Sequence, residues 1–569
     1  MIVSIISLAV FFLILCSGSA LFCTLEIGKF EDGLPITCVS IVCIEFIFGI
    51  AGFLLPGFFV AFAVAVIALG VAMILAIRKE FRAFARRFFT PGFFLFTVMY
   101  VILFVLNYGM RLRAWDEFSH WGDIVKVMTT LHSFGTHPLS ESWFPNYPPA
   151  MALFQFFCEE IYIHISRENM VEWLLFFSYQ VFLFSMYFPF LKRLNLKKVS
   201  GWVVIVVIWL IPMIFQNNAY GKIYIDSFLS TLLGTGFTYV FLEREPDTAG
   251  KLNLAVILFL LPITKSIGLP FAAVLLIALY VLEDRGKRVY TVITLAPWVV
   301  WQIYLKVTHA VKMVGASSGI AAEHIGDSHY VFGILKDYLA AMVRRPVTDA
   351  DAIFPQLPPL VVLLLLMLVL WLLLQKERKS FVIIFAANIL FFMGMGVSFM
   401  YFFPEIEALE LLGIERYLNN MLMADAILAL LLLLDLMNRS VVLEKKVTAA
   451  VLVTALLFTP VRPAARFVLR REVAAAQSLH SRYAPYYDTL AEQTKGKTCS
   501  ILFATDGSDL LDFMLLRTEL RPNHVEMHNY PDNIEKFDYV VMYHLDTPPE
   551  NTENGGIYAV NGNKLIRVN

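Results

Sequence analysis

Residues 93–126 read FFLFTVMYVILFVLNYGMRLRAWDEFSHWGDIVK, an apolar run followed at once by a segment dense in charged and aromatic side chains. The apolar part, residues 93–110, is close to the length that crosses a bilayer as a helix. The polar part, residues 111–126, carries two tryptophans among its acids and bases. Tryptophan is typical of the membrane–water interface, so this part is expected to form a helix lying at headgroup level.

The polar part also contains the candidate catalytic acids. On a helix, Asp116, His120 and Asp123 share one face at spacings of i, i+4 and i+7. A carboxylate at a membrane surface can take the proton of an attacking hydroxyl or hold a divalent metal, and Asp116 and Glu117 are the candidates. The alternative is an amphipathic surface helix whose acids only face water. His120 is the weaker candidate metal ligand, because a histidine beside an aspartate is more often a hydrogen-bonded structural residue.

The composition outside this stretch is that of a membrane protein. Of the 569 residues, 59% are hydrophobic and 16% charged, and the mean hydropathy is +0.69, which excludes a soluble or disordered chain. The formal net charge is −1, so no basic excess points to nucleic acid. Apolar runs recur almost to residue 460, which favours one large membrane unit over several soluble domains.

Fourteen apolar runs are expected to be membrane helices, some of them short of 20 residues. They cover residues 3–22, 36–54, 57–77, 93–110, 171–191, 200–215, 226–242, 252–264, 268–282, 289–305, 357–374, 381–402, 418–437 and 446–461.

Basic residues between these runs set the expected topology. They are Arg78, Lys79, Arg82, Arg86, Arg87, Lys192, Arg193, Lys197, Lys198, Arg285, Lys287, Arg288, Lys376, Arg378, Lys379, Arg439, Lys445 and Lys446. By the positive-inside rule these loops are cytoplasmic. They share one side only if Met1 starts outside and the apolar segment 149–163 does not cross, so that segment is expected to be an interfacial or re-entrant helix.

This topology places the unusual polar segments together on the outer face. They are the loop 111–148, the turn 220–227, the break at Lys265, the loops 306–356 and 403–417, and everything after residue 461. Ionisable groups that line a path across the membrane would indicate transport, whereas polar groups that meet on one face indicate chemistry at that face.

Residues 462–569 are expected to form a small external α/β domain after the membrane region. Its start, Arg462–Ala475, is basic and helix-prone. The expected later elements are strands at Cys499–Ala504 and Phe537–Tyr543, a helix at Ser508–Leu520, and a hairpin of Gly556–Val560 with Leu565–Val568 turned by Asn561, Gly562 and Asn563. The turn from Thr505 to Ser508 could bind a ligand, but a strand-to-helix turn uses such residues in any case.

Four motifs on the expected outer face carry a family resemblance. The loop 111–148 carries the acidic pair Asp116-Glu117 and is closed by Pro145-Asn-Tyr-Pro-Pro149 before an apolar helix. Three shorter motifs follow: Tyr224-Ile-Asp226, Thr264-Lys-Ser-Ile-Gly268 and Glu415-Arg-Tyr417. Each alone has an ordinary explanation, as a helix cap, a snorkelling lysine or a boundary Arg-Tyr pair. Together and in this order, they resemble the GT-C superfamily of polyprenyl-phosphate-sugar-dependent glycosyltransferases, which includes protein O-mannosyltransferases and the aminoarabinose transferase of lipid A.

The resemblance implies an α-helical, multi-pass membrane fold with interfacial helices that roof a cavity. It implies inverting transfer of a sugar from a polyprenyl-phosphate donor to an acceptor hydroxyl on a glycan, lipid or protein. Asp116 or Glu117 would be the base, and Asp226 would position the acceptor or, with Asp116, a divalent Mg or Mn ion. Lys265 and Arg416 would hold the leaving phosphate, since fixed cations act strongly on charge that develops in a dry site.

The supporting candidates are His120, Asp123 and Tyr147. The expected location is a bacterial cytoplasmic membrane with the active face outward, although an endoplasmic reticulum protein would look similar. Residues 1–92 are an addition to the family pattern, which otherwise covers a core of residues 93–461. A transporter or flippase for a lipid-linked saccharide is the main alternative, with Asp425 and Asp435 inside an apolar run as its best support. A scaffold that only presents the terminal domain would leave the clustered acids unexplained.

Overall fold

We describe the protein from a computed structural model, in which residues 1–78, 81–216, 218–243, 246–284, 286–310, 326–347, 352–353, 357–437, 441–495, 497–507, 509–531 and 533–568 are described. Several residues considered above lie outside this set: Lys79, Arg285 and Arg439 of the basic loops, parts of the loop 306–356, and Ser508, where a helix was expected to begin.

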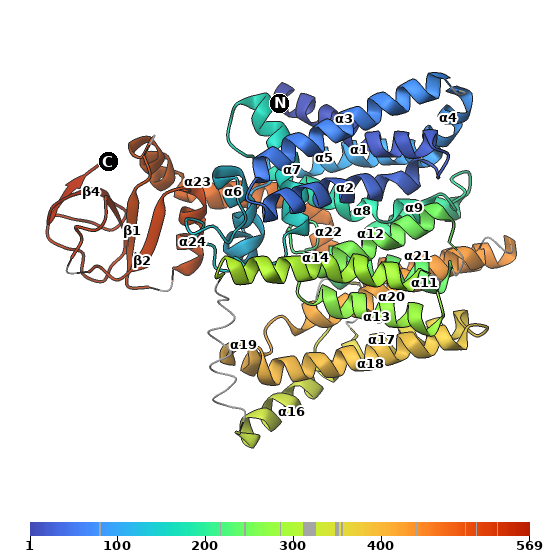
Figure 1. The fold of residues 1–569 in the computed structure, drawn as a ribbon. Coiled ribbons are helices and arrows are strands. Elements are labelled where there is room, and N and C mark those ends of the chain that lie inside the picture. Colours follow the sequence, from blue (N-terminus) through green and yellow to red (C-terminus); the bar gives the residue numbers. More distant parts are fainter. Residues whose placement is uncertain are drawn as a thin grey trace.

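Helices packed side by side form the body of the molecule, and a small domain with a mixed β-sheet lies at one end (Figure 1). The helices are α1 (Ile2–Thr24), α2 (Phe30–Ile50), α3 (Leu54–Arg78), α4 (Phe81–Phe88), α5 (Pro91–Asn107), the π-helical turn η1 (Glu117–Trp121), α6 (Gly122–Leu131), α7 (Ala150–Ser166), α8 (Trp173–Ser185), α9 (Phe188–Leu191), α10 (Val199–Phe215), α11 (Asp226–Phe241), α12 (Thr248–Thr264), α13 (Gly268–Val281), α14 (Lys287–Val307), α16 (Ser328–Arg344), α17 (Pro359–Leu373), α18 (Arg378–Tyr401), α19 (Glu405–Glu410), α20 (Ile414–Met437), α21 (Val441–Phe458), α22 (Val461–Val468), α23 (Arg471–Gln493) and α24 (Leu510–Glu519).

Each of the fourteen expected runs coincides with a helix of the bundle, or with the pair α8 and α9. Five helices of the described chain, α1, α2, α3, α18 and α20, are long and apolar enough to cross a membrane, and the bent pair α4–α5 would make six. The chain is therefore a multi-span membrane protein. The sequence predicts about fourteen membrane helices, some of them shorter than 20 residues, and the helices of the remaining runs do not reach the length and apolar character of a full span.

Four of the helices that are too short to count as spans, α10 to α13, border breaks near the domain end of the bundle. The chain leaves helical geometry between α10 and α11 and again at Lys265, between α12 and α13, and most of the residues in these breaks are buried. Irregular backbone at membrane depth is tolerated only where protein or a water-filled cavity surrounds it. The short helices thus accompany non-helical segments that enter the protein interior.

Polar contacts mark the two ends of the bundle. At the domain end, Lys265 pairs with Asp226 at 2.7 Å and Arg111 with Glu519 at 2.7 Å. At the far end, Lys192 pairs with Asp32 at 2.7 Å and Lys198 with Glu444 at 2.7 Å. Figure 1 shows α6, α19 and the C-terminal domain at one end and α4 at the other. The motif-bearing loops and the basic loops therefore lie at opposite ends.

Helix α7, the segment expected not to cross, is buried among α1, α2 and α8 along most of its length. The segments that precede and follow it both lie at the domain end. Before it, Tyr147 stacks on His120 with ring centroids 4.6 Å apart. After it, Glu172 accepts a hydrogen bond from the backbone N–H of Leu112 at 3.1 Å. The helix therefore enters and leaves the bundle by the same end, the geometry that the basic-loop pattern requires.

The C-terminal domain contains a five-stranded sheet in the order β2-β1-β3-β4-β5. Its strands are β1 (Ser500–Thr505), β2 (His524–His528), β3 (Tyr539–His544), β4 (Ile557–Asn561) and β5 (Lys564–Arg567). Strand β1 pairs in parallel with β2 and β3, and the β4–β5 hairpin turns at Gly562, which has a positive φ of 57°. The polar strand β2 is the element that the sequence pattern missed.

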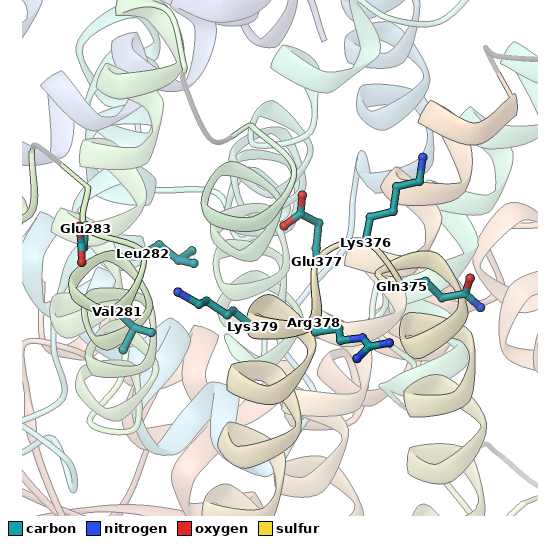
Figure 2. A pocket seen from close by; sticks show the side chains of 8 residues that line it. All are labelled: Val281, Leu282, Glu283, Gln375, Lys376, Glu377, Arg378 and Lys379. Atoms are coloured by element: carbon teal, nitrogen blue, oxygen red, sulfur yellow. The ribbon is translucent and has the colours of Figure 1, made fainter.

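A cavity of about 570 Å³ opens at the far end of the bundle, between the end of α13 and the turn from α17 to α18. Figure 2 shows its lining, residues 281–283 and 375–379, with Lys379 reaching toward Leu282 and Glu283. Its cations belong to one of the basic loops. It lies at the opposite end from the motif-bearing loops, so it is not part of the candidate site.

Candidate active site

Four charged side chains from four separate segments meet at the domain end of the bundle. The ammonium of Lys265 donates to Asp226 Oδ1 at 2.7 Å. The guanidinium of Arg416 donates through Nη1 to Asp116 Oδ2, and its Nε lies 3.7 Å from Asp226 Oδ2. Arg416 therefore bridges the two aspartates, and the four residues form one continuous charged cluster.

Helix boundaries place these side chains. Asp116 directly precedes η1, Asp226 is the first residue of α11, and Arg416 lies in the first turn of α20. Lys265 sits in extended conformation just after α12 ends. The next helix then starts at Gly268, where a Cβ would lie 1.8 Å from the carbonyl oxygen of Leu261. Only glycine permits this approach, which brings Lys265 to the cluster.

Asp226 is the buried centre of the cluster, with an exposure of 1%. Besides Lys265 and Arg416, it accepts a hydrogen bond from Asn420 Nδ2 at 3.1 Å. Asn420 Oδ1 in turn accepts from Ser230 at 3.0 Å. Sequence reasoning missed Asn420, although it follows Arg416 by four residues and so lies on the same face of α20.

Aromatic rings surround the two cations. The guanidinium of Arg416 lies 5.2 Å from the ring centroid of Tyr224 and 5.3 Å from that of Tyr417. The ammonium of Lys265 lies 5.3 Å from the Tyr417 ring. These distances are in the range of cation–π attraction, which holds the cations in place without neutralising them.

Glu117 has a different environment from its neighbour Asp116. Its side chain is fully buried, and its oxygens accept the backbone N–H groups of Arg113 at 2.7 Å, Ala114 at 2.8 Å and Ile223 at 3.1 Å. Burial raises the pKa of Glu117 to about 7. Because its oxygens are engaged in joining two segments of backbone, Glu117 serves as a structural link. Asp116 keeps 18% of its side chain exposed.

His120 and Tyr147 stack on each other beside the cluster, with an angle of 11° between the rings. His120 Nδ1 is 2.7 Å from the hydroxyl of Ser119, and burial lowers the pKa of His120 to about 3. His120 is thus a neutral, buried ring. Burial raises the pKa of Tyr147, and the charges of Asp116 and Arg416 also act on this pKa.

Asp123, expected on the same face as Asp116, points elsewhere. Both of its oxygens accept from Arg521 of the C-terminal domain, at 2.7 and 2.9 Å. The expected face assumed one regular α-helix, but the chain makes a π-helical turn at η1 before α6 begins. A π-helical turn pairs residues i and i+5, which rotates the following residues relative to an α-helix. Asp123 therefore binds the C-terminal domain and is not part of the charged cluster.

The cluster does not fit a divalent metal between Asp116 and Asp226. Arg416 already faces both carboxylates, and Lys265 and Asn420 occupy the other positions around Asp226. An added ion of charge +2 would meet two fixed cations at short range. Positive charge in this site is supplied by the protein.

No protein-family model and no curated protein matches the sequence. Among solved structures, the crystal structure of ArnT from Cupriavidus metallidurans bound to undecaprenyl phosphate matches 76% of this chain and 85% of its own, with 14% sequence identity and a TM-score of 0.43.

Proposed function

We propose that this protein transfers a sugar from a polyprenyl-phosphate-linked donor to an acceptor hydroxyl at the outer face of the membrane. One observation carries the proposal: a partly exposed carboxylate, Asp116, pairs with Arg416, and Asp226 links Arg416 to a second cation, Lys265, at the end of a membrane helix bundle. Displacement of a phosphate from a sugar requires a general base for the acceptor hydroxyl and positive groups that stabilise the departing phosphate.

The donor phosphate binds to Arg416 and Lys265. Without a ligand, the two cations are balanced by Asp116 and Asp226, so an incoming phosphate competes with Asp116 for Arg416. Arg416 presents a planar fork that suits two phosphate oxygens. Donor binding therefore releases Asp116 from its ion pair and makes its carboxylate available as a base.

The reaction is a single displacement. The acceptor oxygen attacks the anomeric carbon while its proton passes to Asp116. The bond between the anomeric carbon and the phosphate oxygen breaks, and its electron pair leaves with the phosphate. The phosphate gains negative charge as it departs, and Lys265 and Arg416 stabilise that charge. Attack from the face opposite the leaving group inverts the anomeric carbon.

Asp226 acts through the cations. Two positive side chains repel each other at short distance in a site poor in water. The buried carboxylate of Asp226 lies between Lys265 and Arg416 and offsets this repulsion. Asn420 fixes the orientation of the Asp226 carboxylate through its hydrogen bond. We therefore assign Asp226 as a positioning residue for the phosphate-binding pair.

The orientation of the bundle supports the outer location. The basic loops gather at the far end, which the positive-inside rule places in the cytoplasm. The cluster and the C-terminal domain would then be extracytoplasmic, in a bacterial cytoplasmic membrane or a comparable one. The acceptor is a glycan, lipid or protein hydroxyl that reaches the cluster from that side.

The test is the release of free polyprenyl phosphate from a panel of polyprenyl-phosphate sugars by the purified protein. Asp116→Asn keeps size but removes proton affinity, so it should lower turnover by on the order of 100-fold. Binding of polyprenyl phosphate should not weaken, because a competitor for Arg416 is removed. Excess Mg²⁺ or Mn²⁺ should not restore turnover.

Glu410→Gln is the matched control, since Glu410 is an exposed acid at the same end of the bundle. It should leave turnover unchanged. Full activity in Asp116→Asn would rule out the catalytic assignment. Arg416→Lys keeps the charge but loses the fork, so it should weaken polyprenyl phosphate binding less than Arg416→Ala does. Unchanged binding in both Arg416→Ala and Lys265→Ala would place the phosphate elsewhere.

The second candidate function, movement of a lipid-linked saccharide, has one observation in its favour. Asp425 is fully buried within α20, away from the end of the helix that carries Arg416. A buried acid inside an apolar helix often serves transport. In proteoliposomes, movement of the lipid-linked saccharide without phosphate release, abolished by Asp425→Asn, would support this function over transfer.

A further inference from the structure

Three cations line the cavity of about 570 Å³ at the far end of the bundle, the end opposite the charged cluster. Lys376 belongs to the turn after α17, and Arg378 and Lys379 are the first two residues of α18. Figure 2 shows Lys379 extended toward Leu282 and Glu283, which follow the end of α13. Within the part of the chain that the structure describes, none of the three cations forms an ion pair. Positive charge that no acid contacts favours an anionic ligand in this cavity.

The charge of the cavity matches that of one phosphate diester. Its lining also contains two acids, Glu283 and Glu377, so the three cations exceed the acids by one. The first residues of α18 border the cavity as well, and the helix dipole makes this end of a helix positive. Backbone N–H groups at such an end bind phosphate oxygens. A phosphate diester carries a single negative charge, which balances the excess of one.

The helices beside the cavity have apolar faces that are open to lipid. Ile277 of α13 and Val382 of α18 lie one helical turn from the cavity residues Val281 and Arg378, on the same helix faces. Ile277 is 58% exposed and Val382 60%. Trp371, near the end of α17, is 50% exposed, and tryptophan is typical of the membrane–water interface. The cavity therefore lies where lipid headgroups meet acyl chains.

We propose that this cavity binds the headgroup of an anionic phospholipid of the phosphatidylglycerol class. The lipid phosphate lies among Lys376, Arg378 and Lys379, and the acyl chains lie against the exposed apolar faces of α13 and α18. Basic pockets between membrane helices bind anionic headgroups in this way. The bound lipid joins α13 to α18 at this end of the bundle. This site is separate from the charged cluster and does not depend on the proposed sugar transfer.

The experiment titrates the purified full-length protein in a neutral detergent with dioleoyl phosphatidylglycerol and counts the bound lipids by native mass spectrometry. The wild type should bind one phosphatidylglycerol more tightly than phosphatidylcholine with the same acyl chains, because the choline cation would meet the basic side chains. The triple variant Lys376→Gln, Arg378→Gln, Lys379→Gln should bind phosphatidylglycerol about tenfold more weakly, or weaker still. Its affinity for phosphatidylcholine should be that of the wild type.

Two double variants test whether charge at this cavity is responsible. Lys376→Arg, Lys379→Arg keeps both charges and should bind phosphatidylglycerol as the wild type does. Lys445→Gln, Lys446→Gln removes two exposed lysines of α21 at the same end of the bundle, which do not line the cavity, and should also bind as the wild type does. If the triple variant does not fold, Lys379→Gln alone should weaken phosphatidylglycerol binding by about fivefold.

Equal affinity for phosphatidylglycerol in the wild type and in the variants that remove cavity cations would overturn the proposal. An equal loss in Lys445→Gln, Lys446→Gln would also overturn it, because it would show a general attraction to the basic end. Displacement of the lipid by an equal concentration of inorganic phosphate or glycerol 3-phosphate would identify a soluble phosphate as the ligand instead. Loss of the lipid in Arg416→Ala, with retention in the triple variant, would place it at the charged cluster.

Discussion

At the scale of single residues, adjacent acids acquire different tasks from their surroundings. Asp116 and Glu117 are neighbours in sequence, yet one faces Arg416 with part of its surface open and the other is enclosed by backbone N–H groups. A carboxylate whose oxygens are already engaged is poorly placed to take a proton from a substrate. The same reasoning separates Asp123, bound to Arg521, from the charged cluster.

Glu117 yields a prediction about pH and stability. Burial raises its pKa from 4.5 to about 7, so its favourable contribution is fully present below about pH 4.5 and is lost as the pH rises through about 7. The cost at pH 8 is on the order of 3 kcal/mol. The melting temperature of the wild type should therefore fall more steeply between pH 5 and pH 8 than that of Glu117→Gln. Parallel curves for the two proteins would contradict this account of Glu117.

At the scale of elements, the break between α12 and α13 sets the position of the Lys265 side chain. Gly268→Ala would force a Cβ to within 1.8 Å of the Leu261 carbonyl oxygen, so the break must open and Lys265 must move. We expect binding of polyprenyl phosphate to weaken by about tenfold or more, since phosphate contacts depend on placement. Gly394→Ala, in α18 with nothing within 4 Å of the new Cβ, should bind as the wild type does. Equal binding by the two variants would mean that Lys265 does not need this break.

At the scale of the whole molecule, the two ends of the bundle differ: one has the basic loops, and the other has the charged cluster and the C-terminal domain. The C-terminal domain is attached to the loop 111–148 by ion pairs of Arg521 and Glu519, so the domain and the cluster share one end. This architecture supports the view that the domain end is outside. A labelling experiment can decide the orientation.

The labelling experiment uses single cysteines in a chain whose six native cysteines are replaced. Leu139 is 63% exposed at the domain end, and Lys197 is exposed at the far end. Leu139→Cys should react with an impermeant thiol reagent in intact cells, and Lys197→Cys should react only after the membrane is permeabilised. The reverse pattern would invert the proposed topology.

The sequence by itself determined the class of fold and its helices. Hydrophobic runs mark each helix because apolar side chains must face lipid or the core, and basic residues mark one end of the bundle. It also singled out Asp116 from the charged interfacial segment, and Asp226, Lys265 and Arg416 from the motifs that carry the family resemblance. Whether they act as we propose stays a prediction.

Only the tertiary structure decided which of these residues touch. The bridge from Arg416 to both aspartates joins segments up to 300 residues apart in the chain, and no local pattern records such a contact. The π-helical turn that rotates Asp123 toward Arg521 and the buried link made by Glu117 are likewise invisible in residue spacing. Spacing reports which residues share a helix face, whereas the packing of distant helices sets which charges are paired, and pairing in a site poor in water determines what each group can do.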